Sequence, residues 1–418
     1  MITASIDFGT TNSVVGINNN GKIEMISLGK ESLETKSVLF YSFEDKNFYV
    51  GDEAIDELKM DTLGRYLVAL KSFLGGKEEI ETTLGTKTYM LDDLISIILK
   101  RFKNIMEKHV GETIDNVVLG RPVHFNDTCK TLDAQAQNRL KEAAKKAGFK
   151  EIVFQYEPIA AALSYEQTIQ KEELILVADI GGGTTDYTVI KVGGASGKRD
   201  RTSDILATHG TYVGGNSFDS EVIQHFVIPH LGKGALYKNM GKEMEISSAL
   251  YTDLIEWHRF QKMYDRNVLN SIEKLIYMSY DKDRISRLLE LIQEGLYFSF
   301  SEKIIDAKVK LSFANSTQIE MDMFSKPFEE ALEREAFEAV ISHQTQKIKS
   351  TLDETLALAN IGYEEIDKVF LTGGSTLVPA VKQIYSELFP SEKLIHTDVF
   401  SSVGYGLAIY ASEVWAEA

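Results

Sequence analysis

The chain has 418 residues, of which 44% are hydrophobic and 26% are charged, and its net charge is −17. This length exceeds that of one compact core and predicts two lobes, while the negative charge argues against nucleic acid or an anionic membrane as a partner. The single cysteine, the lack of an N-terminal signal segment and the lack of an apolar run of membrane-spanning length predict a cytoplasmic protein.

The chain opens with a pattern of strand, tight turn and strand. Apolar residues 2–6 and 13–17 flank the sequence Asp7-Phe8-Gly9-Thr10-Thr11-Asn12. This arrangement predicts a β-hairpin whose turn is rich in glycine and threonine.

Strands and helices are expected to alternate in the rest of the first half. Segments 21–26 and 38–50 are rich in β-forming residues, and apolar periodicity predicts helices at 52–60, 65–70, 92–110 and 131–147, the last ending at Gly148. Buried strands are expected at 116–120 and 152–154, and an alanine-rich helix follows Glu157. The charged segment 167–173 predicts a boundary, so residues 1–170 are assigned to the first lobe.

The second half begins with a repeat of the first hairpin. Apolar residues 174–178 and 187–190 flank the turn Asp179-Ile180-Gly181-Gly182-Gly183-Thr184-Thr185-Asp186. A helical pattern over about residues 218–307 predicts an inserted helical subdomain. A hairpin from 309–313 and 317–321, helices within 328–358 and a strand at 369–372 are expected next. Residues 171–395 form the predicted second lobe, and residues 396–418 a C-terminal helix that packs back toward the first.

Both hairpin turns have the composition of a phosphate-binding loop. Glycine has no Cβ, so its backbone can adopt positive φ and direct successive N–H groups at an anion, and the threonines add hydroxyl donors. Asp7 and Asp179 end the strands that lead into the turns, where a carboxylate can hold Mg²⁺ but would repel bare phosphate. A single copy is more often a plain glycine-rich turn. Two copies with the same leading acid favour one nucleotide held between two lobes.

Several motifs, in order along almost the whole chain, resemble the ATPase domain of DnaK-type heat-shock chaperones. They are the two turns, Gly120-Arg121-Pro122-Val123-His124-Phe125-Asn126-Asp127, Glu157-Pro158-Ile159-Ala160-Ala161-Ala162, Gly214-Gly215-Asn216 and Leu371-Thr372-Gly373-Gly374-Ser375-Thr376. Lys71-Ser72-Phe73-Leu74-Gly75 and Phe154-Gln155-Tyr156-Glu157-Pro158 look closer to the short YegD-type members, which consist of the ATPase domain alone. The resemblance implies an α/β protein with the actin-like ATPase fold: two lobes, each with a mixed sheet flanked by helices, and ATP or ADP with Mg²⁺ in the cleft.

The resemblance also implies roles for individual residues. Lys71 matches the family's catalytic lysine, which orients water and offsets charge on the γ-phosphoryl group, and Glu157, Asp179 and Thr184 join it as catalytic residues. Asp7 and Asp179 match carboxylates around Mg²⁺. The expected nucleotide-binding residues are Gly9, Thr10, Thr11, Asn12, Gly181, Gly182, Gly183, Thr184, Gly214, Gly215, Lys308, Ser312, Gly373, Gly374 and Ser375.

The base side of this expected site departs from the chaperone pattern. Val309 stands where the chaperones have an arginine over the adenine, and Leu377 replaces a second arginine. Ile305 stands where the family usually offers a glutamate to the ribose, a role that Glu302 or Asp306 could take instead. Losing both guanidinium groups removes a cation and a planar stacking surface. An apolar sandwich could still hold a purine, more weakly and with less discrimination.

The resemblance implies slow, Mg²⁺-dependent ATP hydrolysis coupled to opening and closing of the lobes. DnaK-type chaperones continue into a β-sandwich that grips peptide and a helical lid, whereas this chain stops shortly after Trp415. We therefore expect no standard peptide-binding domain, and an unidentified protein partner is possible. The alternatives are an actin-like protein that polymerises with ATP, a protein that binds nucleotide without hydrolysing it, and a small-molecule kinase, for which no sugar-site signature is present.

Overall fold

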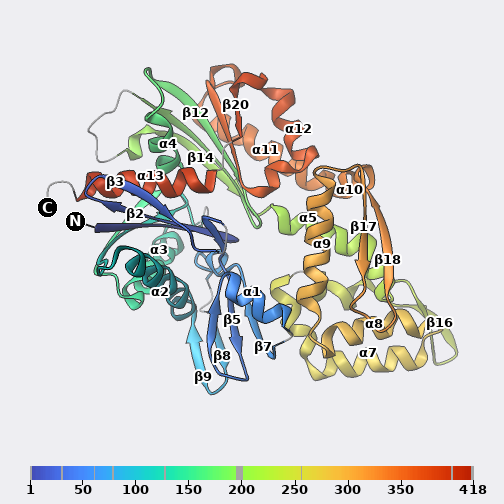
Figure 1. The fold of residues 1–418 in the computed structure, drawn as a ribbon. Helices are drawn as coiled ribbons and strands as arrows, with labels where there is room; N and C mark the ends of the chain where they lie inside the picture. Colours follow the sequence, from blue (N-terminus) through green and yellow to red (C-terminus); the bar gives the residue numbers. More distant parts are fainter. Residues whose placement is uncertain are drawn as a thin grey trace. The chain divides into compact units, whose positions relative to one another are not determined.

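The computed structural model describes residues 2–29, 32–60, 62–77, 80–126, 129–193, 201–255, 257–396 and 399–415. The chain divides into two compact units, and Figure 1 labels many of their helices and strands. The first unit comprises Met1–Tyr212, Lys349–Thr376 and Ile384–Ala418, and the second comprises Val213–Ile348 and Leu377–Gln383. Within the described ranges, no helix has both the length and the apolarity needed to cross a bilayer. The lobe boundary expected near residue 170 falls inside the first unit and stays a prediction.

One mixed sheet of the first unit has the strand order β11-β10-β1-β2-β3, with β4 paired to β2. On one face, α2 (Leu91–Val110) and α3 (Lys130–Ala147) pack on a core that includes Ala4 and Ile6. The predicted end of the second helix is confirmed, because Gly148 caps α3 with a φ of 101°. The strands are β1 (Ile2–Phe8), β2 (Asn12–Asn19), β3 (Lys22–Ile26), β4 (Glu34–Lys36), β10 (Asn116–Arg121) and β11 (Glu151–Tyr156).

The second sheet of this unit has the order β14-β13-β12-β19-β20. Strand β12 pairs antiparallel with β13, where Asp179 lies opposite Asp186, and parallel with β19. Two mixed sheets flanked by helices confirm the predicted α/β class, and both phosphate-type turns join antiparallel strands as expected. The strands are β12 (Glu173–Ile180), β13 (Thr185–Val192), β14 (Ile205–Thr211), β19 (Lys368–Thr372) and β20 (Leu394–His396).

Helices α4 (Glu157–Glu166) and α13 (Val399–Val414) pack against each other and against the first sheet (Figure 1). Glycine makes this approach possible, because a Cβ built at Gly406 would lie 1.8 Å from the carbonyl oxygen of Ala160. Asn18 in β2 donates to the carbonyl of Ala408 at 3.2 Å. Helix α13 therefore packs against α4, the helix that begins at Glu157.

Smaller elements complete the first unit. A three-stranded sheet has the order β6-β5-β7, α1 packs on it, and β8 and β9 form a hairpin. Their bounds are β5 (Leu39–Ser42), β6 (Phe48–Val50), α1 (Asp52–Lys59), β7 (Gly64–Leu67), β8 (Glu81–Leu84) and β9 (Lys87–Met90).

The second unit is mainly helical and carries two hairpins. The chain passes between the units after Tyr212, within α11 (Ser342–Ala359), after Thr376 and within α12 (Pro379–Leu388). Its main elements are α5 (Gly215–Val222), β15 (Leu236–Asn239), β16 (Lys242–Glu245), α6 (Thr252–Ile255), α7 (Arg266–Met278), α8 (Lys282–Gln293), α9 (Tyr297–Leu311), β17 (Ser316–Met321), β18 (Phe328–Glu333) and α10 (Arg334–Val340).

The strand predicted at 309–313 is wrong. These residues end α9, because Phe300, Ile304, Ala307 and Leu311 are buried at helical spacing. The partner of β17 is instead β18, at the start of a region expected to be helical.

Two further helical predictions are wrong in part. Within the expected helical subdomain, residues 236–245 form the hairpin β15–β16, and Met240 and Gly241 make its turn with φ values of 49° and 81°. Residues 65–70 contain β7 followed by Ala69 in the left-handed region, at a φ of 50°, instead of a helix. Both segments are short, and periodicity alone does not separate short strands from short helices.

Candidate active site

Three carboxylates that were predicted separately belong to the first unit. Asp7 is near the end of β1, Asp179 is near the end of β12, and Glu157 is the first residue of α4. The Asp7 side chain is buried, and both aspartates interact electrostatically with Glu157. The folded chain thus brings together acids that lie far apart in the sequence.

Lys71 supplies the positive charge among these acids. Its ammonium donates to Oε1 of Glu157 at 2.7 Å, and the two side chains are 10% and 16% exposed. The lysine lies on a 3₁₀ turn, Leu70–Phe73, which follows the left-handed residue Ala69. A non-glycine residue in that conformation stores strain, which is common at functional sites. Lys71 and Glu157 therefore form a largely buried ion pair, while their catalytic roles stay predictions.

The segment after Lys71 is held by side chains from other elements. Arg139 in α3 donates to the carbonyls of Leu74, at 2.8 Å, and Gly76, at 3.1 Å. The amide of Asn126 donates to the carbonyl of Gly75 at 2.9 Å. These bonds satisfy backbone groups that no strand or helix satisfies, and they fix the position of the lysine turn.

Three acids and one lysine leave an excess of negative charge. Burial and the Glu157 carboxylate raise the pKa of Asp7 to about 8, and the same two causes raise the pKa of Asp179 to about 6. Burial lowers the pKa of Lys71, but the charges of Glu157, Asp7 and Asp179 outweigh it, so the pKa lies above its ordinary value. The site therefore favours any additional cation.

The glycine turns are closed by their own backbones. A Cβ at Gly9 would lie 2.1 Å from the carbonyl oxygen of Asn12, so this position admits only glycine. In the second turn the N–H of Gly181 donates to the carbonyl of Thr184 at 2.9 Å. A Cβ at Gly183 would meet nothing within 4 Å, which leaves open space beside the backbone for an incoming anion. The nucleotide-binding roles expected for both turns stay predictions, for Gly9, Thr10, Thr11, Asn12, Gly181, Gly182, Gly183 and Thr184 alike.

The turn after β19 lies against the second glycine turn. The hydroxyl of Ser375 donates to the carbonyl of Gly181 at 2.8 Å. Gly373 has a φ of 84°, and a Cβ there would lie 2.2 Å from the carbonyl oxygen of Ile180. Gly373 and Ser375 thus lie beside the second glycine turn, while the nucleotide-binding roles expected for Gly373, Gly374 and Ser375 stay predictions.

Gly373→Ala is expected to destabilise the protein by more than about 2 kcal/mol, because the new methyl group would meet a backbone oxygen at a positive φ. Gly374→Ala is the matched control, since a Cβ at Gly374 would meet nothing within 4 Å. Urea unfolding of both variants measures the difference. Equal midpoints would contradict this account of the turn.

Three residues of the site were not singled out by the sequence. Thr372 donates to Oδ1 of Asp179 at 3.1 Å and opposes the rise in its pKa. Gly120 lies beneath the acids: a Cβ there would be 3.3 Å from Cγ of Glu157 and 3.5 Å from Oδ1 of Asp7. Both residues fall inside motifs quoted above, but only their three-dimensional neighbours reveal what they do.

Arg121 is the third. Its guanidinium donates to both oxygens of Asp133, at 2.9 and 3.0 Å, and lies 5.2 Å from the ring centroid of Tyr156. Because Tyr156 directly precedes Glu157, this contact fixes the start of α4. The signal in the sequence that could have pointed to Arg121 is its position at the end of a buried strand.

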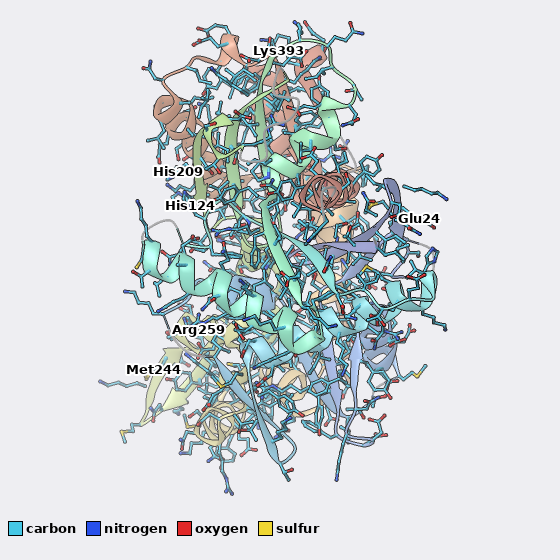
Figure 2. The ribbon with its side chains drawn as sticks, turned by 90° about the vertical axis from the view of Figure 1, so that its left-hand side faces the viewer. Glu24, His124, His209, Met244, Arg259 and Lys393 are labelled. Atoms are coloured by element: carbon cyan, nitrogen blue, oxygen red, sulfur yellow. The ribbon has the colours of Figure 1, made fainter. Side chains whose placement is uncertain are left out.

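A cavity of about 40 Å³ adjoins Glu157 and Asp179 in the same unit. Its polar lining includes Asp186, Thr208 and His124, the last of which is labelled in Figure 2. This volume holds roughly two or three water molecules. The acids therefore have room for water on the side of this cavity.

The second unit contains four more of the expected nucleotide-binding residues, Gly214, Gly215, Lys308 and Ser312. Gly214 precedes α5, and Gly215 begins it. Lys308 in α9 donates to Oδ2 of Asp219 at 2.8 Å and to the carbonyl of Gly215 at 3.1 Å. Ser312 is the C-cap of α9. Lys308 and Gly215 are thus neighbours, and the nucleotide-binding roles of Gly214, Gly215, Lys308 and Ser312 all stay predictions.

Asp7 and Asp179 have the chemistry that Mg²⁺ prefers. Their hard carboxylate oxygens suit this cation, and Mg²⁺ usually binds through one or two carboxylates together with water and substrate phosphate. In the part of the chain that the structure describes, no three His, Cys, Asp or Glu side chains form a metal site from protein alone. The two acids fit a cation that arrives with a phosphate ligand.

The two hairpin turns, their leading acids and the buried lysine–glutamate pair define an α/β protein of the nucleotide-binding class. A model of the family described as Hsp70 protein matches residues 3–235 and 267–415. The chain belongs to the Hsp70 family.

Similar proteins agree with this assignment. The chain is 25% identical to chaperone protein dnaK of Cyanophora paradoxa over 439 residues, which cover 99% of this chain and 60% of that protein. It is 26% identical to chaperone protein DnaK of Mycoplasmopsis agalactiae over 422 residues, with 99% and 59% covered. For chaperone protein dnaK of Cyanidium caldarium the identity is 25% over 442 residues, with 98% and 61% covered. The chain spans about 60% of the length of these curated relatives.

Proposed function

We propose that this protein binds ATP with Mg²⁺ and hydrolyses it slowly, as a DnaK-like ATPase close to the short YegD-type members. The observation that carries the proposal is the buried pair of Lys71 and Glu157, joined at 2.7 Å and coupled to Asp7 and Asp179. These aspartates lead into the two glycine turns. Hsp70 family members are ATPases, and the pair supplies the positioned charge that phosphoryl transfer needs.

In the proposed reaction, water attacks the γ-phosphorus of ATP as the bond to the β-phosphate oxygen breaks, giving ADP, phosphate and a proton. Backbone N–H groups of the turns and the hydroxyls of Thr10, Thr11 and Thr184 would hold the phosphates. Lys71 would offset the charge on the γ-phosphoryl oxygens, with Glu157 holding its ammonium in position. Asp179 would orient the attacking water. Mg²⁺, when bound at Asp7 and Asp179, would neutralise charge on the β- and γ-phosphates.

The proposal extends to the nucleoside and to motion. Gly214, Gly215, Lys308, Ser312 and the turn Gly373-Gly374-Ser375 would hold ribose and base. Hydrolysis would be coupled to opening and closing of two lobes, 1–170 and 171–395, and so to an unidentified protein partner. Gripping of peptides in the manner of full-length chaperones is not part of this proposal.

Phosphate release from ATP and Mg²⁺ tests the proposal. We expect slow turnover by the wild-type protein and at least about a 100-fold loss in Asp179→Asn, because the variant lacks a carboxylate aimed at the metal and the water. Asp115→Asn, which removes an exposed carboxylate paired with Lys150, is the matched control and should behave as wild type. Nucleotide binding by the folded wild-type protein without phosphate release would favour the non-hydrolysing alternative.

A further inference from the structure

Three large apolar side chains are exposed along one line of α9 and its last turn. Ile305, Val309 and Phe313 follow one another at four-residue spacing, and they are 43%, 50% and 76% exposed. The N–H of Phe313 donates to the carbonyl of Lys310 at 3.0 Å, so the helical path continues to this residue. Helices of water-exposed proteins usually place polar residues on such a face, so an apolar line indicates a ligand or partner surface.

This apolar line adjoins the residues of α9 proposed to bind nucleotide. At 3.6 residues per turn, Lys308, Ser312, Ile305, Val309 and Phe313 fall within about 140° of one another around the helix axis. A ligand held by Lys308 and Ser312 can therefore reach the apolar line. In a nucleotide, the part that suits such a surface is the flat ring of the base.

Hydrogen-bonding groups on this face are few. Lys308 already donates to Asp219 and to the carbonyl of Gly215, and Ser312 offers one hydroxyl. Glu302, one turn before Ile305, already has a partner. Leu377, in the same unit, is also apolar and is 51% exposed. A surface of this composition can contact the faces of a base but has few groups with which to read its edge.

Resting on the proposed nucleotide function, we infer that the line of Ile305, Val309 and Phe313 binds the base through apolar contact and accepts purines without selecting adenine. Adenine and guanine have rings of equal size and differ in the polar groups on their edges. A site rejects an analogue strongly when binding of that analogue would leave the site's own polar groups unpaired. An apolar surface discriminates by only about 10- to 200-fold, even between ligands of different size. The substrate class is then a purine nucleoside triphosphate.

The test compares hydrolysis of ATP, GTP and inorganic triphosphate, each with Mg²⁺. We expect kcat/KM values for ATP and GTP within about tenfold of each other, and a lower value for triphosphate, which has no base. The double variant Ile305→Ser/Val309→Ser should lower kcat/KM for ATP and for GTP by the same factor. The kcat/KM for triphosphate should stay unchanged. A preference for ATP over GTP above about 100-fold would overturn the inference while leaving the ATPase proposal intact.

A second variant tests the place of the base independently. Val309→Arg adds a guanidinium that can stack on any purine. It should raise the binding affinity for ATP and for GTP by the same factor, about 2- to 30-fold. Ser299→Arg adds the same side chain to an exposed position at the other end of α9 and is the matched control. Equal effects of the two arginines on all three compounds would show a charge effect only and would overturn the inference. Failure of the folded wild-type protein to bind any of the compounds would instead sink the proposed function.

Discussion

Asp7→Asn is expected to make the nucleotide-free protein more stable above pH 6 and to abolish its response to Mg²⁺ and ATP. In the folded protein, burial and Glu157 raise the pKa of Asp7 from 3.8 to about 8. Between these values the unfolded chain has lost the proton that the folded chain still binds. The free energy of unfolding therefore falls as pH rises, by at most about 1.4 kcal/mol per pH unit from this group.

Asparagine removes this dependence because it has nearly the shape of the protonated acid and no proton to lose. Thermal unfolding at intervals from pH 5 to pH 8 should show a flatter profile for the variant and a higher midpoint at pH 8. Addition of Mg²⁺ and ATP at pH 8 should raise the thermal unfolding midpoint of the wild-type protein but not that of Asp7→Asn. Asp115→Asn serves again as the exposed control. A variant less stable than wild type at pH 8 would refute the charge argument.

Lys71→Ala is expected to lower phosphate release by at least about 100-fold and to destabilise the nucleotide-free protein most at high pH. The change leaves Asp7, Glu157 and Asp179 without their shared counter-charge. Removing one partner from a buried ion pair costs about 3–5 kcal/mol when the other stays ionised. At pH 5 the acids with raised pKa values are protonated in the folded protein, so the penalty should shrink.

Lys71→Arg separates charge from geometry. The guanidinium keeps the positive charge but is planar and larger than an ammonium, so stability should be largely retained while phosphate release stays low. Urea unfolding at pH 5 and pH 8, together with phosphate release under saturating ATP, gives both readouts. If Lys71→Ala loses the same stability at both pH values, the excess of negative charge is not what the lysine balances.

The two glycine turns could be predicted as hairpin turns because their sequence signal is local. Gly9 and Gly181 follow buried strands, lie beside threonines and come after an acid, all within a few residues. Helices α2 and α3 could also be predicted from the sequence, since each shows one apolar face over many turns. Long, regular patterns average out local ambiguity.

The environment of Lys71 could not be predicted from its own sequence. The residue lies 86 positions from Glu157, and its turn depends on a left-handed Ala69 and on Arg139 from another helix. Only the family resemblance pointed to it. The hairpin at 236–245 was missed for a different reason, because a few exposed residues leave no apolar period to read.

The close packing of α13 on α4 has a mechanical consequence. At Gly406 and Ala160 the two helix backbones approach each other without a side chain between them, and interiors packed this closely have low compressibility and transmit strain. We therefore expect the two helices to respond together to a displacement, and Glu157 is the first residue of α4. A force applied to the C-terminal helix reaches the carboxylate beside Lys71 along a path of three residues, with little compliance in between.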